Sequence, residues 1–249
     1  MRLTDWWDTP EWHKYEIAYG DEPGTRSRLL TSATWQTRVV DLSQDETALW
    51  RGVRRSYHSI VNRLTREFRP WTPDDWLSDE PRRGERHVTD GEGAGYIVRT
   101  CELLHKADAG RQTRSDATWQ LMGEWAETGH GLFVDAEDWS APPLPALVAA
   151  NPIIVDGQPL DMAKPLPMIG FVYFSRYGNW AYYHSAASLR RDINIALVWW
   201  AMLALKARGV RWCELGWRGC AISDKECGIE FFRSGFGGID VPINVELAV

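Results

Sequence analysis

The alternation of apolar and polar positions divides the C-terminal half of the chain into regular elements. Residues 168–186 form two β-branched and aromatic runs around Tyr177-Gly178-Asn179, which predicts a tight β-hairpin. Residues 188–209 contain an uninterrupted apolar run and predict a buried helix. Residues 210–238 follow as a strand, a Leu215-Gly216 turn and a cationic loop that ends in a glycine cluster. The predicted order is strand, strand, helix, strand and loop.

The N-terminal half begins with a predicted strand over residues 38–42 and a helix that continues to about Phe68. Ser43, with Glu46 three residues later, has the form of a capping box. Seven apolar side chains fall within one arc of this helix, as expected of a helix docked on a sheet. They are Trp50, Val53, Tyr57, Ile60, Val61, Leu64 and Phe68. Its arginines gather on another side, with Arg51, Arg55 and Arg66 among them.

The pattern also suggests how the chain is divided. Residues 1–36 read as an aromatic arm, and residues 37–249 as one α/β domain. Within the domain, residues 70–95 are rich in Pro, Gly and charge and predict a long loop, and residues 141–167 predict a proline-rich insertion. Between these segments we predict a strand at 96–98, a helix at 115–127 and a strand at 129–135.

Composition narrows the function classes. A net charge of −6 argues against nonspecific coating of duplex DNA, since that affinity comes from phosphate neutralisation. The four cysteines include no C-x-x-C pair, which favours free, mostly buried thiols in a reducing compartment. The N-terminus lacks a signal peptide's apolar core, and the longest apolar run, residues 195–205, is too short to span a bilayer. We therefore expect a cytoplasmic protein, and the sequence leaves its oligomeric state open.

Three motifs in this order carry a family resemblance. They are TRVVDLSQDETALWRGVRRSYHSI (37–60), MIGFVYFSRYGNWAYYHSAAS (168–188) and VRWCELGWRGCAISDKECGIEFFRSGFGG (210–238). Over roughly residues 37–238 the chain resembles the FemAB-like branch of the GNAT acyltransferase superfamily. The resemblance implies a central mixed β-sheet flanked by helices, with two central strands that splay apart. It also implies direct attack of an amine on an activated acyl carbon, with backbone N–H groups stabilising the oxyanion. We expect the strands 168–176 and 180–186 to be the splayed pair.

The resemblance implies two alternative donors. GNAT enzymes usually hold coenzyme A through a glycine-rich loop before a helix, but residues 187–194 contain no glycine. FemAB-like enzymes also lack that loop, and they take an aminoacyl group from aminoacyl-tRNA. Aminoacyl-tRNA is therefore the favoured co-substrate. Acyl-CoA is the alternative, with Arg190 and Arg191 binding phosphate; no tightly bound cofactor or metal is expected. A noncatalytic binding module that keeps the fold is a third hypothesis.

The same motifs suggest site residues. Phe232-Arg233 stands where the family has a Phe-Lys pair, so Arg233 would stabilise charge at the reacting ester or the tRNA terminus. Glu214 takes the place of an acidic residue at a strand end and could accept the amine proton. Tyr183 is a further catalytic candidate, and Phe232, Lys225 and Phe174 are assigned to donor binding. Each of these residues also has a structural interpretation. Arg233 could stack on a neighbouring aromatic ring, Glu214 could hold the next loop by hydrogen bonds, and Lys225 could be a solvated lysine.

The arginine-rich helix suggests a nucleic-acid partner. Arg51, Arg55 and Arg66 form a local basic surface in an acidic protein, which could hold tRNA phosphates; a solvated helix face is the alternative. FemAB proteins usually contain two GNAT-like halves, whereas one complete half is recognisable here. A cell-wall substrate is therefore not carried over, and the amine-bearing acceptor stays open.

Overall fold

The computed structural model describes residues 36–70, 84–91, 94–112, 114–138, 154–155, 158–159, 168–190, 192–218 and 224–242. Within these residues one mixed sheet has the strand order β10-β1-β9-β8-β7-β4-β3-β2. The strands are β1 (Gln36–Asp41), β2 (Arg69–Pro70), β3 (Glu85–Thr89), β4 (Gly131–Glu137), β7 (Met168–Tyr177), β8 (Trp180–Ser188), β9 (Trp212–Arg218) and β10 (Ile239–Pro242). Neighbours are antiparallel except for β8 with β9 and β2 with β3. The predicted α/β class with a central mixed sheet is confirmed.

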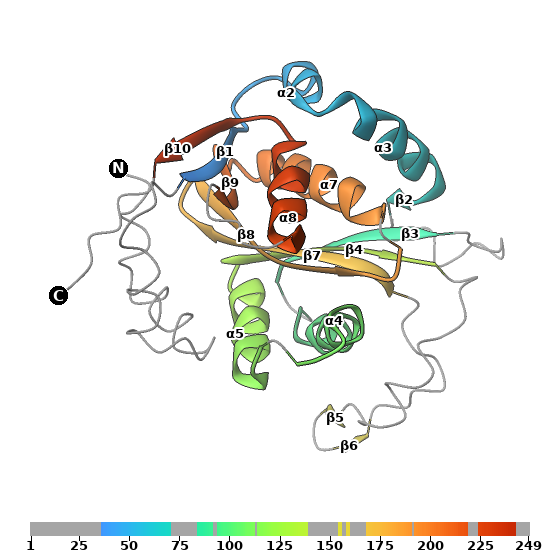
Figure 1. Cartoon of the computed structure of the whole chain (residues 1–249). Coiled ribbons are helices and arrows are strands. Elements are labelled where there is room, and N and C mark those ends of the chain that lie inside the picture. The colour runs from blue at the N-terminus through green and yellow to red at the C-terminus, as the bar shows by residue number, and fades with distance from the viewer. Residues whose placement is uncertain are drawn as a thin grey trace.

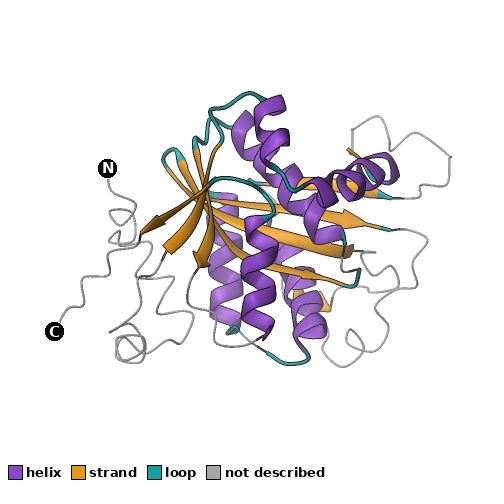
Figure 2. Cartoon of the chain, turned by 45° about the horizontal axis from the view of Figure 1, so that its top comes forward, coloured by secondary structure: helices purple, strands orange, loops and turns teal. Residues whose placement is uncertain are grey.

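Helices cover both faces of this sheet (Figure 1). They are α2 (Glu46–Gly52), α3 (Arg55–Glu67), α4 (Ala94–Ala109), α5 (Asp116–Glu127), α7 (Ile193–Ala207) and α8 (Asp224–Ser234). α4 and α5 lie on one face, whereas α2, α3 and α7 lie on the other, and α8 contacts β9. Figure 2 shows the same layers after a turn of the molecule.

Each helical layer has its own apolar cluster. The larger cluster joins α2, α3 and α7 to the sheet, and it contains all seven apolar side chains predicted to line one arc of the N-terminal helix. The second packs α4 and α5 on the opposite face, around Trp119 and Phe171. The thiols of Cys101 and Cys213 are buried in these clusters, while Cys227 is exposed, and all three are free. The prediction of free thiols therefore holds for the described cysteines; Cys220 lies outside them.

The hairpin and the apolar helix have the predicted positions. β7 and β8 pair through to Tyr177 and Trp180, so that Gly178 and Asn179 form a two-residue turn in which Gly178 has a φ of 56°. Helix α7 packs on β7, β4 and α3, and the Trp200 indole donates to the Thr65 hydroxyl at 3.1 Å. That hydrogen bond satisfies a polar group that burial would otherwise leave unpaired.

The predicted single helix over residues 45–68 is wrong, because the chain forms two helices. Val53 is extended, with φ −70° and ψ 137°, and α3 starts after Arg54. The capping box is also wrong: the Asp45 carboxylate, two residues after Ser43, accepts from the Ala48 N–H at 2.8 Å. The break turns α3 away from α2 without moving the apolar side chains out of the core.

Three other predictions around the middle of the chain need correction or lie partly outside the described residues. The predicted loop over 70–95 contains β3, and the predicted strand at 96–98 belongs to α4. The helix at 115–127 and the strand near 129–135 are confirmed as α5 and β4. Residues 1–35 and most of 141–167 lie outside the described part, which contains only the short strands β5 (Ile154–Val155) and β6 (Gln158–Pro159) of the proline-rich segment.

The last predicted loop is helical. Residues 224–234, which include Arg233, form α8, and the glycines follow its C-terminal end. The Leu215-Gly216 step is not a turn, because both residues lie within β9. Among the described residues, no helix is both long and apolar enough to cross a membrane.

The splayed strands are β8 and β9, not the predicted pair β7 and β8. β7 and β8 stay paired along their lengths, whereas the parallel pair β8–β9 is joined only from Trp180 to Tyr182 and from Trp212 to Glu214. Both strands continue beyond that point. We call the place where pairing stops, at Tyr182 and Glu214, the β8–β9 fork.

Candidate active site at the β8–β9 fork

Glu214 is the last residue of β9 that pairs with β8, and it is fully buried. Its Oε1 accepts a hydrogen bond from the Thr37 hydroxyl of β1 at 2.6 Å, and Oε2 has no hydrogen-bond partner among the described residues. Burial raises the pKa of Glu214 to about 8, although the Thr37 hydrogen bond and the Arg233 charge act in the opposite direction. This carboxyl is therefore mostly protonated at neutral pH and can exchange a proton near the working pH.

Arg233 reaches the same place from the last turn of α8. A Cβ atom at Gly216 would lie 2.8 Å from an Arg233 nitrogen, so the guanidinium packs directly on the β9 backbone. Gly216 has a φ of 99°, and Leu215 is an extra residue in β9 opposite β1, so a bulge opens the strand here. Two features therefore require a glycine at position 216: its backbone conformation and the space that Arg233 occupies.

Two aromatic side chains complete the apolar wall near Arg233. The guanidinium lies 5.8 Å from the centre of the Tyr183 ring, and that ring lies 5.3 Å from Phe174 of β7. Burial raises the pKa of Tyr183 to about 12, so the phenol remains a neutral hydrogen-bond donor. The predicted residues Arg233, Glu214, Tyr183 and Phe174 are thus brought together at the fork.

The end of α8 is fixed by the α2–α3 junction. Arg54 donates to the Phe231 carbonyl and to the Ser234 hydroxyl, both at 2.9 Å, and stacks on the Phe231 ring at 3.7 Å. Phe232, predicted to bind the donor, packs against the larger apolar cluster beside Phe236. A Cβ at Gly235 would meet the Tyr57 ring at 2.2 Å, which shows why a glycine follows α8. Gly235 therefore lets the end of α8 pack closely against Tyr57.

His184 marks a second bulge. Tyr173 pairs with Ser185 and Phe174 with Tyr183, so His184 is the extra residue of β8 just past the fork. Its ring packs edge-on against Tyr182 at 4.6 Å. Burial and the Arg114 charge keep the pKa of His184 well below its usual value, so the imidazole is neutral.

Sequence reasoning missed Thr37 and Arg114. Arg114, just before α5, donates to the His184 carbonyl at 3.1 Å and contacts the His105 ring nitrogen at 2.6 Å. It therefore fixes the bulge of β8 from the face opposite α7. No local pattern signals either residue, since Thr37 opens an ordinary strand and Arg114 looks like a cation before a helix cap.

The turn between β8 and α7 is occupied by its own ion pairs. Arg190 donates to both carboxylate oxygens of Glu67, at 2.6 and 3.1 Å, and to Asp192 at 3.1 Å. Arg63 of α3 also donates to Asp192, and the Ile193 N–H donates to the Arg190 carbonyl. The hydrogen bonds with Glu67 and Asp192 raise the pKa of Arg190, so it stays charged but is already paired.

The other predicted contacts are only partly described. Arg51, Arg55 and Arg66 are all exposed on α2 and α3, as a solvent-facing basic surface requires. Lys225 lies in the first turn of α8, not in a loop, but its side chain is outside the described part, as is the whole of Arg191.

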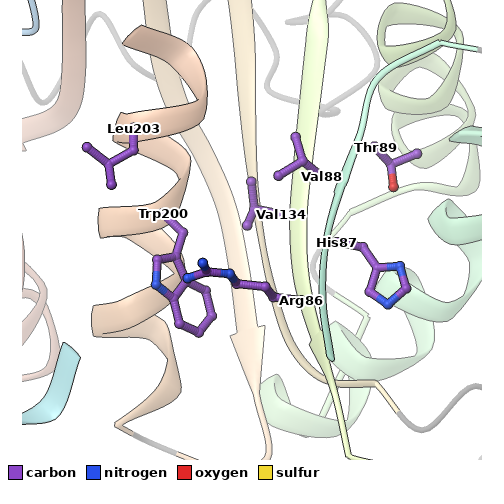
Figure 3. A pocket seen from close by; sticks show the side chains of 7 residues that line it. All are labelled: Arg86, His87, Val88, Thr89, Val134, Trp200 and Leu203. Atoms are coloured by element: carbon purple, nitrogen blue, oxygen red, sulfur yellow. The ribbon is translucent and has the colours of Figure 1, made fainter. Parts of the chain in front are cut away.

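A separate hollow of about 450 Å³ lies away from the fork. It is lined by Arg86, His87, Val88, Thr89, Val134, Trp200 and Leu203, from β3, β4 and α7 (Figure 3). Arg86 stacks over the Trp200 ring at 4.7 Å and fills part of this space. None of the predicted site residues lines it.

Comparisons with known proteins identify the fold. No family model and none of the curated proteins matches the chain. FemX matches with a TM-score of 0.55 at 12% identity, over 83% of this chain and 59% of that one. The C-terminal domain of a putative lysylphosphatidylglycerol synthetase from Agrobacterium fabrum gives 0.51 at 12% identity, over 85% of this chain and 59% of that one. L-PGS from Bacillus licheniformis gives 0.50 at 9% identity, over 84% and 58%.

The chain thus spans about three fifths of each of these proteins. At such low identity the likeness is one of fold, and it confirms the predicted architecture of a mixed sheet flanked by helices, of the kind found in FemX.

Proposed function

We propose that this protein is an acyltransferase that moves an aminoacyl group from aminoacyl-tRNA to an amine by direct attack. The observation that carries the proposal is the β8–β9 fork, where a buried carboxyl and an arginine converge on strands that have stopped pairing. The name of one neighbour, a putative lysylphosphatidylglycerol synthetase, describes a product that contains an aminoacyl group, which supports aminoacyl transfer.

The residues at the fork suit the charges of such a reaction. When an amine attacks an ester carbonyl, the oxygen gains negative charge and the nitrogen must lose a proton. Arg233 supplies a fixed positive charge for the oxygen, but its guanidinium cannot give up a proton at neutral pH. Glu214, whose pKa is raised to about 8, accepts the amine proton in its ionised form and can return one to the leaving hydroxyl. Tyr183 adds a neutral donor beside Arg233.

The turn before α7 favours aminoacyl-tRNA over acyl-CoA as the donor. A pyrophosphate site needs free backbone N–H groups and no negative charge at the helix N-terminus. Here the Ile193 N–H already has a partner, and the Asp192 carboxylate stands at the start of α7. Arg190, the cation available in the described part of this turn, is paired with Glu67 and Asp192. Coenzyme A would have to break these contacts before binding.

The exposed arginines of α2 and α3 suit the other part of such a donor. Arg51, Arg55 and Arg66 face solvent, and the remaining arginines of this region, Arg54 and Arg63, are held in contacts with α8 and Asp192. The three exposed cations can therefore neutralise RNA phosphates without disturbing the fold. We propose that this surface binds the acceptor arm of tRNA.

A binding titration tests the donor. Purified protein is titrated with charged bulk tRNA, uncharged bulk tRNA and acetyl-CoA at two salt concentrations. We expect saturable, salt-dependent binding of tRNA, tighter for the charged form, and no response to acetyl-CoA. Stabilisation by acetyl-CoA alone would move the protein to acyl-CoA chemistry, and no response to any of them would favour a noncatalytic binding module.

A further inference from the structure

β3 and β4 place four ionisable side chains on one face of the sheet. In their antiparallel register Glu85 lies opposite Glu137, and His87 lies opposite Asp135. Directly opposed residues share a face, and residues two apart on a strand share it as well. We call these four residues the β3–β4 cluster. It lies three strands from β8 in the sheet order, so it is not part of the fork.

The distances within the cluster suit ligands around one ion. The His87 Nε2 atom lies 3.6 Å from a Glu85 carboxylate oxygen and 3.8 Å from a Glu137 carboxylate oxygen. One ligand atom from each of the three residues lies within 4.8 Å of the other two. Metal–ligand bonds of about 2.0–2.2 Å place neighbouring ligand atoms about 3–4 Å apart, so small side-chain movements would close the three around one cation.

The carboxyl groups of the cluster are buried. Glu85 is 2% exposed, Asp135 1% and Glu137 6%. Carboxylates removed from water are costly unless a cation or hydrogen bonds compensate them.

The compensating cation does not come from the neighbouring arginine. Figure 3 shows Arg86 reaching toward Trp200 of α7, whereas His87 points to the other side of β3. The Oδ1 atom of Asp135 has no hydrogen-bond partner among the described residues, although this side chain is almost completely buried beside His87.

We propose that the β3–β4 cluster is a divalent-metal site, with Glu85, His87 and Glu137 as ligands. Imidazole and carboxylate donors together suit Zn²⁺ or Mn²⁺ better than the all-oxygen cations Ca²⁺ and Mg²⁺. The bound ion joins β3 to β4 through side chains as well as through the backbone. This assignment does not depend on the proposed transfer reaction.

Metal content and thermal stability test the site. The tag-free protein is stripped with a chelator, supplied with Zn²⁺ or Mn²⁺ alone, freed of excess metal and examined by elemental analysis. We expect about one ion per chain and, with metal at roughly 100 times Kd, a rise in Tm of about 5 °C or more. A wild-type protein that retains no ion and shows no metal-dependent Tm would overturn the proposal.

Variants locate the ion. His87→Ala and Glu137→Gln should each weaken metal binding by at least about tenfold, while the matched changes His130→Ala and Glu124→Gln, at exposed positions on the same chain, should leave it unchanged. Circular dichroism verifies folding, and Glu85→Gln serves as a second isosteric variant if His87→Ala does not fold. Unchanged affinity in the folded cluster variants would place the ion elsewhere and contradict the assignment.

Discussion

Two groups of buried carboxyls lie on the same sheet and are compensated in different ways. At the fork, Glu214 has a hydroxyl from Thr37 and the charge of Arg233 nearby. In the β3–β4 cluster, two carboxyl groups lie close to one histidine, and the adjacent arginine points to the other face. The first arrangement suits a carboxyl that gains and loses protons, because its compensation is partial. The second suits a bound cation, because its three possible ligand atoms lie within 4.8 Å of one another.

The arginines of this protein also form two sets, one exposed to solvent and one held in contacts within the fold. The exposed arginines of α2 and α3 remain available to a partner, while Arg54, Arg63 and Arg190 are used to hold α8 and the turn before α7. The position of Arg233 depends on this second set. The geometry of the fork is therefore built from contacts between residues far apart in the sequence.

Replacing Glu214 should have the largest effect, and it should appear in the pH dependence of stability. The folded-state pKa of about 8 lies above the usual value of 4.5, so the folded protein binds the extra proton. Its stabilising effect is fully present below about pH 4.5 and is lost as the pH rises through 8. In the wild type this loss is on the order of 4 kcal/mol of the free energy of unfolding, and Glu214→Gln should not show it.

Urea titrations at several pH values measure that difference. The control is Glu230→Gln, a glutamate on α8 that should keep the wild-type profile. Parallel pH profiles for the wild type and Glu214→Gln would mean that Glu214 ionises normally in the fold.

Removing the metal should have the next largest effect. If the β3–β4 cluster holds a cation, chelation leaves its carboxylates uncompensated and should lower the free energy of unfolding by about 2–3 kcal/mol, as for a ligand present at roughly 100 times its Kd. Differential scanning calorimetry with and without chelator measures this loss. Glu214→Gln should keep the same sensitivity to chelator, since the fork is a separate site. Loss of chelator sensitivity in this variant would show that the two sites are coupled.

Arg233→Ala should reduce transfer by at least about tenfold, equivalent to about 1.4 kcal/mol of transition-state stabilisation, without lowering Tm. Arg233→Lys keeps the charge and should retain most of the activity, and Arg111→Ala, at an exposed site, is the matched control. Steady-state kinetics and a thermal melt of each variant make the test. Equal losses of activity and stability in Arg233→Ala would show a structural arginine.

The smallest change is expected from the basic surface of α2 and α3. Replacing Arg51, Arg55 and Arg66 with Gln should weaken tRNA binding and lower the slope of log K against log salt by about 2 to 3, as expected for the loss of three phosphate contacts. The rate of transfer at saturating tRNA should stay the same. Filter binding at four salt concentrations measures the slope, and an unchanged slope would remove this surface from the RNA site.

The elements predicted well are those whose signals are local. The β7–β8 hairpin and α7 follow from a two-residue turn and from an apolar run, and both have nearly the predicted bounds. Four of the predicted site residues meet because the order of these elements determines what lies beside the fork. The prediction of the splayed pair was wrong because the β8–β9 pairing joins strands separated by α7. No local sequence pattern signals where such pairing stops.

The elements missed are those whose local pattern conflicts with their structure. β3 has the sequence Glu-Arg-His-Val-Thr, in which the buried face carries Glu85 and His87, so its alternation looks like a charged loop. α8 contains Gly228 and precedes a glycine cluster, which favours a loop prediction. Such local inconsistencies are expected where residues serve a site and not the fold alone.

The most direct test of the central claim follows the aminoacyl group itself. Charged bulk tRNA carrying labelled amino acids is incubated with the protein and a panel of small amines and peptides with free N-termini, and amide products are separated from hydrolysed amino acid. The account predicts label in an amide product with the wild type and with Arg111→Ala, and at least about tenfold less with Arg233→Ala. Amide formation at equal rates with wild type and Arg233→Ala, or none with any amine while acetyl-CoA supports acylation, would contradict it.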